Sequence, residues 1–117
     1  MSRSVPERLQ DILDAIARAP LADRLMSRAE AMHDEDGVSV AFDAILHNLF
    51  VLGEAVKSLP DELLLNSTEI PWNDIAALRD VIGHHYHRVV PAIIHSTVRV
   101  DLTPLEVATR ELMHYVE

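Results

Sequence analysis

The chain has 117 residues, which is enough for one domain with a hydrophobic core. Cysteine is absent, which excludes a disulfide framework and thiol chemistry, and 49% of the residues are hydrophobic, which excludes a disordered protein. The formal net charge of −9 argues against long, non-specific binding to duplex nucleic acid.

The composition favours helices. There are only three glycines and few aromatic residues, while alanine and leucine are abundant. We expect an all-α fold, a bundle of four to five main helices that forms a single domain over residues 1–117. The longest apolar region, residues 38–56, carries polar and charged side chains, and no apolar stretch follows the first residues. We therefore predict no membrane span and a cytoplasmic protein.

The first third of the chain predicts two helices. Ser4 followed by Glu7 is a capping-box pattern, and the apolar residues that follow recur at helical spacing. The first helix is expected over residues 4–19, and Pro20 is expected to end it or to start the next. A short second helix is expected over residues 21–32. The run Asp34–Gly37 then reads as a turn.

The remaining elements follow in order. Residues 38–59 carry a wide apolar stripe and are predicted to form the longest, central helix. A connector with one helical turn over 62–65 leads to a helix over 74–86, with Asn73 as its cap and Trp72 as a core anchor where it begins. A shorter helix is expected over 91–98. Thr103, with Pro104 and Glu106 after it, is a start signal for a last helix that ends near residue 116.

Residues 78–88 are the segment where chemistry is expected, because three of the seven histidines lie in it. On a helix Asp80 and His84 share a face, so the carboxylate can fix one imidazole tautomer and leave the other nitrogen free for proton transfer. Arg79 and Tyr86, seven residues apart, also share a face. Gly83 has no side chain and would let a backbone or a substrate approach closely.

The charge is uneven along the chain. Residues 79–99 hold three arginines and four histidines against one acidic residue, Asp80, whereas acidic residues dominate elsewhere. A small basic site on an acidic body is compatible with gripping a few nucleotides. The acidic body also suits docking to a basic partner protein.

The spacing Arg79, four residues, His84, one residue, Tyr86 resembles the R-x4-H-x-Y motif of HepT-like toxins, which belong to the HEPN superfamily of ribonucleases. Two flanking signals agree with it. Residues 52–55 resemble the apolar-Gly-Glu-Ala signature of that family, and residues 70–72 resemble its Ile-Pro-Trp signature. The similarity covers residues from about 40 to 116. His85 and His87 depart from the family pattern and blur which imidazole has which role.

The resemblance implies a HEPN-like homodimer that acts as the toxin of a toxin–antitoxin pair. Arg79 and His84 of both chains would meet in one cleft and cleave RNA without a metal or other cofactor, with Asp80 and Gly83 in support. The place of Glu54 in the Gly-Glu-Ala signature implies that it supports the site by pairing with a cation of the motif. It also implies a minimal nucleotidyltransferase antitoxin that adenylylates Tyr86. The added AMP would place negative charge beside the cleft and repel RNA phosphate.

Two other interpretations stay open. The spacings Glu30 to His33 and Glu111 to His114 match the Glu-x-x-His pairs of di-iron bundles, although both lie at helix ends. His84 with His87 could also chelate a surface metal. Alternatively, the chain is a HEPN-like dimer that has lost catalysis and acts only as a binding or interaction module.

Overall fold

The computed structural model describes residues 3–85 and 102–116. Within these ranges the chain forms five α-helices and no strand, so the all-α prediction is confirmed. The helices are α1 (Val5–Ala31), α2 (Glu35–Lys57), α3 (Asp61–Leu64), α4 (Trp72–His85) and α6 (Leu102–Val116). The predicted helix over residues 91–98 lies outside the described residues. The single domain over 1–117 stays a prediction.

Helix α1 begins with the predicted capping box. The Glu7 amide donates to the Ser4 hydroxyl at 3.2 Å, and the Ser4 amide donates to the Glu7 carboxylate at 2.9 Å. The second of these bonds lowers the pKa of the Glu7 carboxyl, because it stabilises the charged form. The prediction that Pro20 separates two helices is wrong, since α1 runs through it. A proline inside a helix costs about 3 kcal/mol, and burial of apolar residues on both sides of it, Ile16 and Met26 among them, offsets that cost.

The connection between α1 and α2 is shorter than predicted. Met32 and His33 form the turn, and His33 takes the left-handed conformation at φ 55° that ends many helices. Asp34 is the N-cap of α2 and accepts from the Gly37 amide at 3.0 Å. The prediction of a turn over Asp34–Gly37 is therefore wrong. These acidic residues instead form the first turn of a helix, where the helix dipole favours negative charge.

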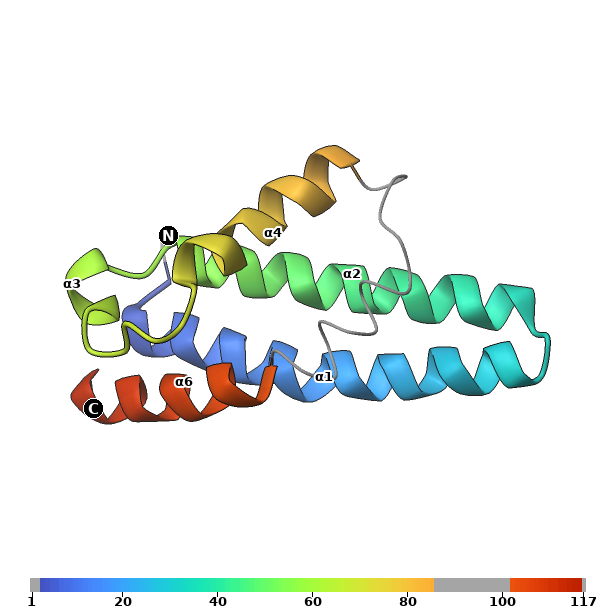
Figure 1. Cartoon of the computed structure of the whole chain (residues 1–117), viewed down its shortest axis with the longest axis horizontal. Helices are drawn as coiled ribbons and strands as arrows, with labels where there is room; N and C mark the ends of the chain where they lie inside the picture. The colour runs from blue at the N-terminus through green and yellow to red at the C-terminus, as the bar shows by residue number, and fades with distance from the viewer. Residues whose placement is uncertain (1–2, 86–101, 117) are drawn as a thin grey trace.

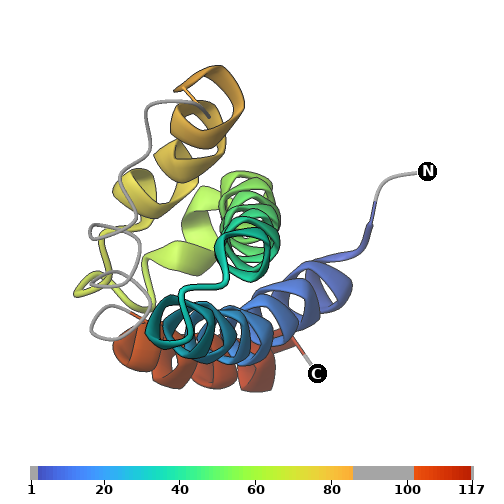
Figure 2. The same cartoon turned by 90° about the vertical axis from the view of Figure 1, so that its right-hand side faces the viewer.

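Helix α2 lies between α1 and α4, and α6 packs on the other side of α1 (Figures 1 and 2). Its central position confirms the sequence-based expectation, whereas α1, with 27 residues against 23, is the longer helix. By length and composition alone α2 would qualify as a membrane span. Its apolar side chains Ile45, Leu46 and Leu49 are almost fully buried in the bundle, which is the arrangement of a core helix.

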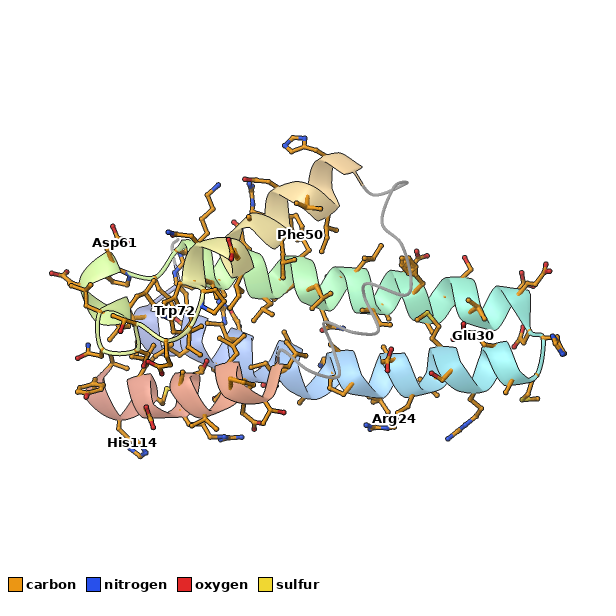
Figure 3. All side chains as sticks on the ribbon, viewed as in Figure 1. Arg24, Glu30, Phe50, Asp61, Trp72 and His114 are labelled. Atoms are coloured by element: carbon orange, nitrogen blue, oxygen red, sulfur yellow. The ribbon has the colours of Figure 1, made fainter. Side chains whose placement is uncertain are left out.

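The segment before α4 is anchored in the core. Ile70 and Trp72 are buried, and the Trp72 indole donates to the Ser67 carbonyl at 2.8 Å, so the predicted anchor role of Trp72 is confirmed (Figure 3). Helix α4 begins at Trp72, and its first helical bond runs from the Ile75 amide to the Pro71 carbonyl at 3.1 Å. The prediction of Asn73 as the cap is wrong by two positions, because burial of Trp72 draws the helix start towards the core.

The two remaining helices begin close to their predicted positions. The expected turn in the connector is α3, which starts one residue earlier than predicted. Helix α6 begins at Leu102, one residue before the predicted cap, and buries Leu105 and Leu112. Differences of one or two residues are normal at helix ends.

Candidate active site

The predicted site lies where α4 crosses α2, and Gly53 allows the two helix backbones to approach each other closely there. A Cβ on Gly53 would stand 2.8 Å from the Arg79 backbone nitrogen and 3.1 Å from the Ile75 carbonyl oxygen, which is nearer than such atoms can pack. Glycine at this position is therefore required by the approach of α4. A close approach was predicted at Gly83 and not at Gly53. A lone glycine inside a strongly apolar helix is the signal that would have found it.

Gly83 has a different environment. It is exposed, and a Cβ there would meet only the Phe50 ring edge at 3.7 Å, an ordinary contact. No backbone of the described residues packs close against it. The close approach of a backbone or a substrate to Gly83 therefore stays a prediction.

Arg79 is held by three neighbours. Its Nε forms an ion pair with the Glu54 carboxylate on α2, and its Nη1 donates to Asp80 at 3.2 Å. The guanidinium carbon stands 5.8 Å from the centre of the Phe50 ring, within the range of a cation–π contact. The predicted pairing of Glu54 with a cation of the motif is thus confirmed. These contacts orient the Arg79 guanidinium. Because 36% of the side chain stays exposed, an anion can still reach it.

His84 lies in the last turn of α4 and is exposed. Helix α4 diverges from α2 towards this end, so the turn stands away from the bundle (Figure 1). The expected hydrogen bond between Asp80 and His84 is not formed within the described residues, since Asp80 accepts from Arg79 instead. The adjacent Arg79 side chain can reach this carboxylate and competes for it. Tyr86 and His87 lie outside the described residues.

The two Glu-x-x-His pairs do not form one site. Glu30 lies at the C-terminal end of α1, next to the turn into α2. His114 projects from α6 at the opposite end of the bundle (Figure 3). The molecule is 46 Å long. Across the part of the chain that the structure describes, no three His, Asp or Glu side chains are grouped to hold a metal ion. The pairing required for a di-iron bundle is therefore contradicted by the geometry.

The profile of the family described as Ribonuclease HepT-like matches residues 8–112. The chain belongs to this HepT-like family of the HEPN superfamily. Relatives of this HepT-like chain carry names that agree with the match. "Putative RNase TTE0752" of Caldanaerobacter subterraneus subsp. tengcongensis is 34% identical over 91 residues, which cover 76% of this chain and 81% of that protein.

A second relative covers more of the chain. "Probable ribonuclease HepT" of Thermococcus cleftensis is 30% identical over 106 residues, or 91% of this chain and 93% of that protein. No solved structure gives a significant match. The family and the relatives support a ribonuclease of the HEPN type.

Proposed function

We propose that the protein is a metal-independent endoribonuclease whose catalytic residues are Arg79 and His84. The observation that carries this proposal is the partly exposed Arg79 guanidinium, which is held by Glu54 of α2 and by Asp80 and lies on α4, the helix that also presents His84. A guanidinium in that state binds phosphate and stabilises the charge that grows on it during cleavage. Membership of a ribonuclease family supports RNA as the substrate.

The chemistry needs one base and one acid. An imidazole takes the proton from a ribose 2′-hydroxyl, the 2′-oxygen attacks the adjacent phosphorus, and the bond to the 5′-oxygen breaks. A second imidazole gives a proton to the departing 5′-oxygen. The products are a 2′,3′-cyclic phosphate and a 5′-hydroxyl, and no metal takes part. Because the His84 copies of two chains supply both imidazoles, the proposed enzyme is a two-fold homodimer.

The proposed role in the cell is that of a cytoplasmic toxin. A minimal nucleotidyltransferase antitoxin would silence it by transferring AMP from ATP to the Tyr86 hydroxyl, with release of pyrophosphate. Tyr86 follows the last described turn of α4 by one residue, which puts it next in the chain to the helix that carries Arg79 and His84. Support for this role comes from the motif spacing and the family.

The cleavage test compares variants on one defined RNA in the presence of EDTA. Arg79→Ala and His84→Ala should each cut cleavage by about a hundredfold or more, the scale for losing an acid/base or a charge-stabilising donor. Arg110→Ala is a matched control, because Arg110 is an exposed arginine that pairs with Glu106 on α6. Wild-type activity in both site variants would move catalysis to other residues, whereas a wild type that cleaves no RNA would favour the non-catalytic binding module. Loss of wild-type cleavage in EDTA and its rescue by a divalent ion would favour metal-dependent chemistry.

The silencing test uses Tyr86→Phe, which keeps the ring and removes the hydroxyl. Wild type incubated with ATP, Mg²⁺ and a cognate nucleotidyltransferase should gain mass in whole AMP units, whereas Tyr86→Phe should gain none and keep cleaving RNA. Intact mass and RNA cleavage are read on the same samples. An equal mass gain on both proteins would move the modified residue elsewhere.

A further inference from the structure

A small hollow lies beside Arg79, where the first turns of α1 meet the second half of α2. Its volume is about 120 Å³, and its lining includes Arg3, Arg8, Phe50 and Glu54. Phe50 and Glu54 are also the α2 residues that contact Arg79. The hollow therefore adjoins the proposed catalytic group through two shared side chains.

The charges around the hollow are unequally compensated. Arg3 donates from Nε at 2.7 Å and from Nη2 at 2.8 Å to the Asp11 carboxylate, so its charge is matched. Arg79 is matched by Glu54 and Asp80. Arg8 donates its Nε to the Arg3 carbonyl at 3.2 Å and helps to lower the pKa of the Glu7 carboxyl through its charge, but it forms no close ion pair with any carboxylate of the described residues. Arg8 is half-buried and held through its Nε, so the guanidinium is pre-positioned and its Nη groups are left to donate to an anion.

Phe50 supplies the second element of a nucleotide site. Its ring is only partly buried between α2 and α4 (Figure 3), and the Arg79 guanidinium carbon stands 5.8 Å from the ring centre. The absent Cβ of Gly83 leaves one ring edge uncovered by a side chain from that position. Unpaired bases of RNA bind by stacking on aromatic rings and on arginine planes. Phe50, which lines the hollow together with Arg8 and lies under the Arg79 guanidinium, offers an aromatic surface next to two arginines.

We propose that the hollow between α1 and α2 is a subsite for single-stranded RNA, in which Arg8 binds a backbone phosphate next to the one held by Arg79 and Phe50 stacks a base. This subsite rests on the proposed function and extends it along the strand. It also explains how an acidic protein grips RNA: the contacts come from a few oriented cations, with acidic residues covering the rest of the surface.

The test measures binding of a fluorescein-labelled 2′-O-methyl oligoribonucleotide, which lacks the attacking hydroxyl and cannot be cleaved. Arg8→Gln should raise the Kd at least fivefold and reduce the slope of log Kd against log salt by about 0.7, the value for one phosphate contact on a single strand. Phe50→Leu, which keeps an apolar side chain, should raise the Kd about tenfold. Arg24→Gln should match wild type, since Arg24 projects from α1 on the side away from α2 (Figure 3).

The outcomes separate the subsite from the function. If the wild type cleaves RNA and Arg79→Ala does not, yet Arg8→Gln and Phe50→Leu bind the probe as Arg24→Gln does, the subsite is refuted and the function stands. A change of oligomeric mass in Arg8→Gln by light scattering would reassign the hollow to a contact between chains. If the wild type neither binds the probe nor cleaves any RNA, the proposed function fails and the subsite fails with it.

Discussion

At the scale of single residues, Gly53 and Glu54, which are adjacent in sequence, together position Arg79. Gly53 lets the α4 backbone come within contact distance, and Glu54 then meets the Arg79 guanidinium. Neither residue would place the cation alone, because an exposed ion pair is worth only about 0–1 kcal/mol and cannot hold a long side chain without the packing beneath it. The Gly-Glu pair is thus a positioning device for the proposed phosphate-binding group.

Gly53→Ala should destabilise the protein, against the usual trend. Alanine normally stabilises a helix by about 1 kcal/mol relative to glycine. Here the new Cβ would stand 2.8 Å from the Arg79 backbone nitrogen, so α2 and α4 must move apart. We expect a net loss of about 1–3 kcal/mol in the free energy of unfolding, measured in urea, and weaker RNA cleavage because Arg79 leaves Glu54.

The matched control is Gly83→Ala on the same pair of helices. Its Cβ would meet Phe50 at 3.7 Å, which is ordinary contact, so its stability should equal or exceed that of the wild type. If Gly53→Ala is as stable as Gly83→Ala, the α4 backbone does not pack against Gly53 as closely as described.

At the scale of the elements, the sequence predicted the helices that depend on local patterns. The capping box at Ser4 starts α1 as expected, and the apolar stripe of α2 occupies the centre of the bundle as expected. Both signals act within a few residues, so they can be read from the sequence. The pairing of Glu54 with Arg79 was predicted only through the family signature, since it joins residues 25 positions apart.

The predictions failed where packing between elements overrides local preference. Pro20 reads as a helix end, but the buried residues on both sides of it hold α1 together against α2. The acidic run after His33 reads as a turn, yet Asp34 caps α2 and the turn closes one residue earlier on a left-handed His33. Likewise, Asp80 could have served either Arg79 or His84, and only the side-chain geometry shows that it serves Arg79.

At the scale of the whole molecule, the distribution of charge and the position of His84 bear on assembly. The chain carries 19 acidic against 10 basic residues, so its surface as a whole repels RNA. The proposed catalytic cations therefore have to be concentrated at one site to bind RNA phosphate. In one chain, His84 stands exposed at the end of a diverging helix, with no hydrogen-bond partner among the described residues. A second copy related by two-fold symmetry would bring another arginine and another imidazole to the same place.

The composite site predicts complementation between two inactive variants. A homodimer of Arg79→Ala keeps two imidazoles and no guanidinium, and a homodimer of His84→Ala keeps the reverse. Their heterodimer holds one of each, so the variants co-expressed with different tags and purified through both should cleave RNA at least about tenfold faster than either homodimer. Recovery should stay below the wild-type rate, because the second imidazole is missing. Light scattering of the wild type should give twice the chain mass of 13.1 kDa. A monomer at micromolar concentration would contradict the composite site, whereas a heterodimer as inactive as its parents would show that cleavage requires both imidazoles.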